Sequence, residues 1–209
     1  MNTRFFLSVI LISVFFTNCR LALNRKVKYD GLTLNLTALN AKSIDIALLD
    51  HREAVTNGSQ GPDFVGYAKS RTGISWPMKT RSKNALMVDL STDIVSSFEK
   101  SGVKVTNVNT KYNDDKDEVK LHLLNLAGDK KIVLVFDQLH TDGYGAQYLN
   151  YKLTLYLYDS AGQLLRSKVM IGREKIGGTV LWGSGRFKTY MPAAMIKLLE
   201  DIFKEALPQ

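Results

Sequence analysis

The strongest constraint on the fold is a stretch of regular alternation, QYLNYKLTLYLYD, at residues 147–159. Apolar Tyr151, Leu153, Leu155 and Leu157 alternate there with Lys152, Thr154, Tyr156 and Tyr158. Period two is typical of a β-strand that buries one face. Strand-like runs flank this stretch at 131–139 and 163–177, and Ser160-Ala161-Gly162 supplies a turn before the second of them. The last third of the chain is therefore predicted to be an antiparallel meander with one covered side.

Three other segments have helical periodicity. Apolar residues recur at three- and four-residue spacing over 82–100 and over 190–206, which predicts two amphipathic helices. Another helix is expected over 114–127, with Asn113 as its cap and Gly128 at its end. Acidic residues fill the first turn of that helix, where the helix dipole favours them.

Shorter apolar runs complete the predicted fold. Strands are expected at 43–50, as a hairpin within 64–78 with its turn at Thr72-Gly73, and at 103–105. Strands and helices in this order predict an α+β fold, a mostly antiparallel sheet with helices packed on one face. We interpret residues 43–209 as a single domain of this class.

The first 18 residues have the pattern of a cleaved signal peptide. A positive start at Arg4 precedes residues 5–16, which are apolar apart from two serines. A membrane-spanning helix needs about 20 apolar residues, so this run is too short for a permanent span. The chain is therefore predicted to be exported.

Cys19, the single cysteine of the chain, stands where this leader ends. Residues 16–19, FTNC, resemble a bacterial lipobox, in which the cysteine is diacylated and becomes the mature N-terminus. A lone cysteine is more often a small buried hydrophobe. Its position here favours lipidation, because it has no second cysteine to pair with in an export context. We expect a diacylglycerol and an N-acyl chain on Cys19 and no other cofactor.

The predicted lipid anchor on Cys19 indicates where the protein is located in the cell. Two or more acyl chains hold a protein stably on a membrane, so residues 19–42 are interpreted as a lipidated N-terminus and linker arm. Arg20 resembles the residue pattern of lipoproteins sorted to the outer membrane, which implies a domain that faces the periplasm. The chain has 28 Lys and Arg against 20 Asp and Glu, a net charge of +8. The export signal argues against nucleic acid as the partner of this basic chain and leaves anionic membrane or envelope polymers.

No catalytic or metal-binding pattern is present in the sequence. The histidines His51, His122 and His140 do not occur in HExxH or metal-spaced pairs, and no GxSxG motif appears. The alternating acids after Asn113 lack the glycine and glutamate that an EF-hand loop requires, so helix capping explains them better. We therefore expect a protein that is not an enzyme and holds no metal.

The mature chain resembles the YajG-type bacterial lipoproteins and, more distantly, the auxiliary lipoproteins of envelope transport systems. The likeness rests on the anchor, on IDIALLDHR with Asp50 and Arg52, and on FVG at 64–66. It extends through a helix that runs into SGVKV, the long meander and the C-terminal helix. The resemblance implies a periplasm-facing lipoprotein without a catalytic centre.

Two functional hypotheses follow from the polar and aromatic residues. In the first, the protein is an interaction or assembly module of the cell envelope, whose contact surface includes Trp76 and Trp182. In the second, it binds an anionic cell-wall fragment or lipid through its basic residues, with a concave pocket as the expected sign. Those basic residues are Arg52, Arg71, Lys79, Arg81 and Arg186. A third interpretation, in which these side chains only pack and solubilise the domain, stays open at this point.

Overall fold

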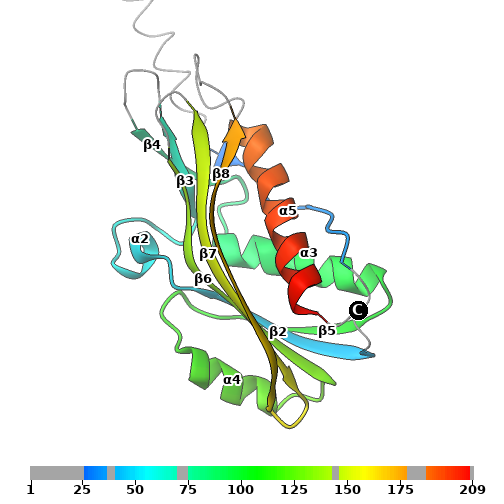
Figure 1. The fold of residues 1–209 in the computed structure, drawn as a ribbon. Coiled ribbons are helices and arrows are strands. Elements are labelled where there is room, and N and C mark those ends of the chain that lie inside the picture. Colours follow the sequence, from blue (N-terminus) through cyan, green and yellow to red (C-terminus); the bar gives the residue numbers. More distant parts are fainter. Residues whose placement is uncertain (1–25, 37–40, 70–74, 143–145, 178–186, 208–209) are drawn as a thin grey trace, which may run out of the picture.

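The computed structural model describes residues 26–36, 41–69, 75–142, 146–177 and 187–207. In chain order its elements are β1 (Lys26–Val27), β2 (Ser43–Asp50), α2 (Glu53–Thr56), β3 (Phe64–Lys69), β4 (Ser75–Thr80), α3 (Leu86–Lys100), β5 (Lys104–Val108), α4 (Lys116–Leu124), β6 (Lys130–Asp142), β7 (Gln147–Asp159), β8 (Leu164–Gly177) and α5 (Phe187–Ala206). The strands form a three-stranded sheet and a five-stranded sheet, and helices flank them (Figure 1). The α+β class predicted from the sequence is confirmed.

The larger sheet has the strand order β5-β2-β6-β7-β8. Its β6-β7-β8 half is the predicted antiparallel meander, and these two ladders are the longest in the molecule. The other half differs from the prediction, because β2 is parallel to both β5 and β6. The connections explain this: the chain reaches β5 through α3 and β6 through α4, and a helical crossover returns it to the same end of the sheet.

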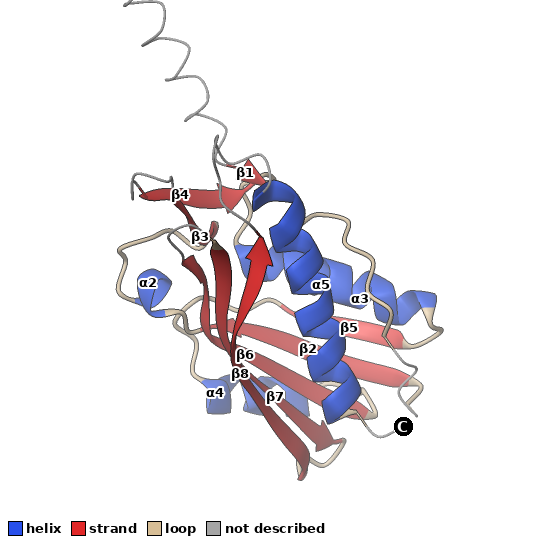
Figure 2. Cartoon of the chain, turned by 45° about the horizontal axis from the view of Figure 1, so that its top comes forward, coloured by secondary structure: helices blue, strands red, loops and turns tan. Residues whose placement is uncertain are grey.

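One side of this sheet, which we call the inner face, is covered by α3 and α5 (Figure 2). Fully buried Ile46, Leu134 and Leu155 project from three neighbouring strands into this core. The two helices meet above them through Phe98 and Phe203, whose rings pack edge to face with centroids 5.4 Å apart. Each such buried side chain contributes about 1.5–3 kcal/mol, so this core is the main source of stability.

The opposite side, the outer face, carries a smaller core under α4. Val119 and Leu123 of α4 pack there on Ala47, Leu49 and their neighbours in β6. Helices therefore cover both faces of the sheet, where the sequence had indicated one. The reason lies in β2, which is apolar at successive positions and buried on both faces, as a parallel strand in a sheet interior must be.

The helix expected over 114–127 is shorter than predicted and has a different cap. Asp115 rather than Asn113 is the capping residue, because its extended backbone lets its carboxylate accept the main-chain N–H groups of Asp117 and Glu118. The helix spans Lys116–Leu124 and so ends before Gly128. The capping role of this acidic cluster is confirmed.

Residues 26–36 of the predicted arm pack on the domain. β1 pairs in parallel with β4, and Tyr29 and Leu34 are buried in the main core. The Asp93 carboxylate on α3 accepts the main-chain N–H groups of Gly31 and Leu32 at 2.9 and 3.0 Å. Burial raises the pKa of Asp93, and these two hydrogen bonds oppose that shift. The segment thus joins the body well before the first long strand.

Candidate functional site

Asp50 and Arg52, predicted to bind a ligand or partner, instead form a buried ion pair with each other. The Arg52 guanidinium donates to both carboxylate oxygens of Asp50, from Nε and Nη2, at 2.7 Å each. Its Nη1 donates to the main-chain oxygen of Phe64 at 2.6 Å. This fork holds the end of β2 to the start of β3, so the pair has a structural role.

Tyr29 lies close enough to Arg52 for the two to interact electrostatically. Its side chain is fully buried, and its hydroxyl has no hydrogen-bond partner among the described residues. Burial raises the pKa of Tyr29, while the positive charge of Arg52 opposes this shift only in part. The phenol therefore stays neutral beside the ion pair.

The other predicted site residues are not brought together with this pair. Trp76 lies half-buried on β4, and Lys79 of the same strand is paired with Asp63 at 3.0 Å. Arg81 is exposed after β4, where its main-chain N–H donates to Val27. Cys19, Arg71, Trp182 and Arg186 lie outside the described residues.

A cavity of about 450 Å³ opens beside Arg52. It is lined by residues 52–54 at the start of α2 and by Phe64 and Tyr67 of β3, which we call its aromatic wall, and by residues 137–140 of β6 and Lys152 of β7, which we call its floor. This volume lies within the range of small-molecule sites in proteins. We call it the β6 cavity.

The floor of the β6 cavity contains a second, partly exposed ion pair. Lys152 Nζ lies 3.0 Å from a carboxylate oxygen of Asp137, and both side chains reach solvent. The register between β6 and β7 shifts between Phe136 and Gln138, so Asp137 is the extra residue of a β-bulge. Bulges redirect side chains, and this one brings Asp137 into the cavity beside Lys152.

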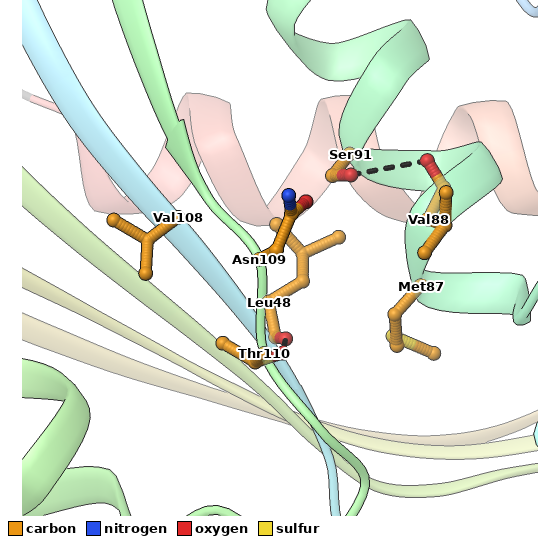
Figure 3. Close-up of a pocket in the computed structure, with 7 residues that line it drawn as sticks. All are labelled: Leu48, Met87, Val88, Ser91, Val108, Asn109 and Thr110. Carbon is orange, nitrogen blue, oxygen red and sulfur yellow. Dashed lines mark hydrogen bonds between the residues drawn. The ribbon is translucent and has the colours of Figure 1, made fainter.

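Another cavity, between α3 and the end of β5, is too small for a ligand. It encloses about 10 Å³ among the seven residues of β2, of α3 and of the chain around the end of β5 that Figure 3 labels. Space of that size holds at most one water molecule. Its polar groups also bond locally, since the Thr110 hydroxyl donates to the Leu48 oxygen and Ser91 Oγ to the Val88 oxygen. These residues therefore pack α3 against the sheet and do not form a ligand site.

The outer face of β8 is a third candidate surface. Exposed large apolar residues gather along this strand: Leu164, Leu165, Val169 and Ile171. Val169 and Ile171 lie opposite Thr154 and Lys152 of β7, so they point to the outer face, away from the inner core. Within the described ranges no strand pairs with the far side of β8. We call these four residues the β8 apolar strip.

Sequence reasoning missed both the cavity and the strip. A signal for the strip was present, because Val169, Met170 and Ile171 form an apolar run between the basic residues Lys168 and Arg173, but such a run is equally typical of an ordinary buried strand. The cavity had no local signal, since its residues come from four separate segments. No group of His, Cys, Asp and Glu within the described ranges is arranged to hold a metal ion.

Comparison with known proteins shows the fold. No protein-family model and no curated protein sequence matches the chain. Protein XCC0632 of Xanthomonas campestris, assigned to the family DUF330, matches with a TM-score of 0.51, 11% identity and 85% and 88% coverage of this chain and of that one. An uncharacterized protein matches with a TM-score of 0.52, 11% identity and 86% and 97% coverage.

Lipoprotein GNA1162 of Neisseria meningitidis is similar at a lower TM-score of 0.41, with 11% identity over 76% of this chain and 98% of its own. At these identities the two stronger matches show a shared fold alone. Among the helices of the described residues, none is both long and apolar enough to cross a membrane.

Proposed function

We propose that this chain is a lipoprotein, anchored through Cys19 in the outer membrane, that serves as a non-catalytic interaction module of the bacterial cell envelope. The leader and its lipobox-like end support the anchor, as does the resemblance to YajG-type lipoproteins. The observation that carries the interaction role is the β8 apolar strip. Single exposed apolar residues are common on protein surfaces, but a row of them on one edge strand marks a contact surface.

The chemistry of β8 indicates the kind of partner. The strand carries Arg166, Lys168, Arg173 and Lys175 against one acid, Glu174, a net charge of +3. Three of these bases contact neighbours: Lys168 pairs with the Glu205 carboxylate of α5, Arg166 donates to the Glu205 main-chain oxygen, and Arg173 lies over the Tyr148 ring. An envelope protein that offers apolar side chains flanked by acids would complement this edge.

The alternative function, binding of an anionic envelope ligand, has less support among the described residues. Arg52 and Lys79, two of its five proposed bases, are already paired with carboxylates. The β6 cavity places two cations, Arg52 and Lys152, against two acids, Glu53 and Asp137. A site for an anion would show an excess of cations instead.

The interaction role is tested by site-specific photo-crosslinking in intact cells of the natural host. A photoreactive amino acid replaces Ile171, which is 68% exposed, and in a matched control it replaces Leu121 of α4, which is 63% exposed. We expect one stoichiometric envelope-protein adduct from position 171, absent at position 121 and lost when Val169→Asp is added. Equal labelling from both positions, or no adduct at 171, would refute the docking surface.

The anchor needs its own measurement. Intact mass spectrometry of the detergent-extracted protein is expected to give a mature N-terminus at Cys19 that carries acyl chains. A Cys19→Ala variant should stay uncleaved or be released from the membrane. An unmodified Cys19 in the mature protein would refute the anchor, whatever the crosslinking shows.

A further inference from the structure

The β6 cavity has a composition that the interaction role does not use. Apolar surface comes mainly from Ala54 and the ring of Tyr67, because Phe64 and Leu139 also line the cavity but are almost fully buried. Polar groups are interspersed with it, and they include carboxylates, an ammonium group and the Gln138 amide. Mixed lining of this kind, with a few polar groups that fix orientation, is typical of a specific ligand site.

The aromatic wall is held in place by its own contacts. The rings of Phe64 and Tyr67 pack edge to face with centroids 5.0 Å apart. The side-chain amide of Gln60 donates to the Tyr67 hydroxyl at 3.3 Å, and the Tyr67 main chain is fixed by two hydrogen bonds with the Thr141 hydroxyl. Thus Tyr67 presents a positioned ring rather than a mobile one, which reduces the entropy lost when a ligand packs on it.

The polar floor offers donors and acceptors side by side. Asp137 only accepts hydrogen bonds and Lys152 only donates them, and their charged atoms are 3.0 Å apart. Two adjacent hydroxyls of a sugar ring have a similar spacing, and each can donate or accept. One such pair can therefore satisfy both ends of this ion pair at once, without adding a charge.

The same features disfavour other ligand classes. Four charged residues line the cavity, which penalises a lipid chain. Asp50 already neutralises Arg52, and the remaining charged groups of the lining are Lys152 against Glu53 and Asp137, so an anion gains no net attraction. We propose that the β6 cavity binds a short, neutral saccharide, with Asp137 and Lys152 bonded to adjacent hydroxyls and Tyr67 packed on the sugar.

The test uses the full chain in a detergent without a sugar head group. Maltotriose, cellotriose and triacetylchitotriose are titrated by calorimetry at low and at high salt, beside trigalacturonic acid and a capped trialanine peptide. We expect at least one neutral saccharide to bind with an affinity that salt does not change. Lys152→Met and Asp137→Asn should each weaken binding about 10-fold or more, because each removes a charge-assisted hydrogen bond.

The molecule supplies a matched control. Lys79 and Asp63 form an ion pair with the same 3.0 Å separation and similar exposure, but neither residue lines the cavity. Lys79→Met should leave saccharide binding unchanged, and all three variants should keep the wild-type thermal midpoint, since exposed pairs contribute about 0–1 kcal/mol. Binding of only the acidic saccharide, of only the peptide, or of no probe would overturn the proposal. Calorimetry measures these outcomes with Ile171 unchanged, so they are distinguished from the crosslinking result even though Ile171 lies opposite Lys152.

Discussion

Two buried ion pairs lie at opposite ends of β2, and they are built differently. Near its start, Asp45 binds Lys131 of β6 with 2.5 Å between the charged atoms, across 86 residues of chain. Near its end, Asp50 binds Arg52, only two residues away. The first pair joins two strands, while the second forms a local clamp that reaches β3 through the Phe64 oxygen.

The difference shows why each pair uses its own cation. Lys131 meets two separate acceptors, a carboxylate oxygen of Asp45 and the Leu126 main-chain oxygen, which suits the point charge of an ammonium group. Arg52 meets both oxygens of one carboxylate, which suits a planar fork. Neither pair is free to bind a ligand, so charge at the end of a strand was a poor indicator of function here.

The largest expected effect comes from Lys131→Met. Among the described residues, the change leaves the buried Asp45 carboxylate with the Gly128 main-chain N–H as its one remaining donor. We expect a loss of about 3–5 kcal/mol in the free energy of unfolding, measured by urea denaturation.

The control for this change removes both charges. Since a buried pair can be replaced by apolar residues at little cost, Asp45→Val with Lys131→Met should recover most of the loss. If the single variant loses less than about 1 kcal/mol, then water reaches Asp45 and the pair is not buried in solution.

Arg52→Lys tests the local clamp between Asp50 and Arg52. We expect this substitution to lower the free energy of unfolding by about 2–3 kcal/mol, less than Lys131→Met. The substitution keeps the positive charge but loses the bidentate contact with Asp50 and the reach to the Phe64 oxygen. Urea denaturation provides the measurement. If Arg52→Lys leaves the free energy of unfolding almost unchanged, then a positive charge without the planar fork is sufficient at this end of β2. That result would refute the conclusion that the two pairs require different cations.

The local elements of the fold were predictable because their signals are local. The strand at 43–50 has the predicted bounds, since its apolar run is bounded by polar residues on both sides. The helix expected over 82–100 was also found, but it begins at Leu86. Before it, the side chains of Ser82 and Asn84 bond to Asp89 and hold a turn instead.

The pairings and the site were not predictable, because they join distant segments. The sequence of β2, SIDIALLD, does not indicate whether its neighbouring strands are parallel or antiparallel. The sequence of α4 likewise does not predict which face of the sheet the helix covers. Lys131 sits within an apolar strand next to another lysine, and only the fold shows which one is buried. The β6 cavity likewise depends on a β-bulge at Asp137, and the sequence around Asp137 contains no glycine or proline that would predict a bulge there.

Gly66→Ala is a further test of the Arg52 end. Gly66 has φ +139, and a Cβ atom there would lie 2.5 Å from Thr141 Oγ1 and 2.9 Å from the Thr141 main-chain nitrogen. Because β3 approaches β6 so closely, the substitution should shift β3 and cost about 1–2 kcal/mol in the free energy of unfolding. Gly58→Ala is the control, since its φ is +75 but no atom lies within 4 Å of its Cβ. If Gly66→Ala and Gly58→Ala lower the free energy of unfolding equally, then backbone strain alone explains the loss and the close contact with β6 adds nothing to it.

The smallest effect is expected at an exposed carboxylate beside the Asp45 pair. Asp129 accepts hydrogen bonds from the main-chain N–H groups of Lys42 and Ser43, and these bonds, first that of Lys42, lower its pKa. A group whose pKa is lower in the folded state adds stability above its unfolded pKa of about 3.9, and this stability is lost as the pH falls through the folded value. Urea midpoints should therefore fall less steeply below about pH 4 in Asp129→Asn than in the wild type. Identical slopes would mean that the start of β2 is held by the buried pair alone, which would make the comparison between the two ends of this strand sharper still.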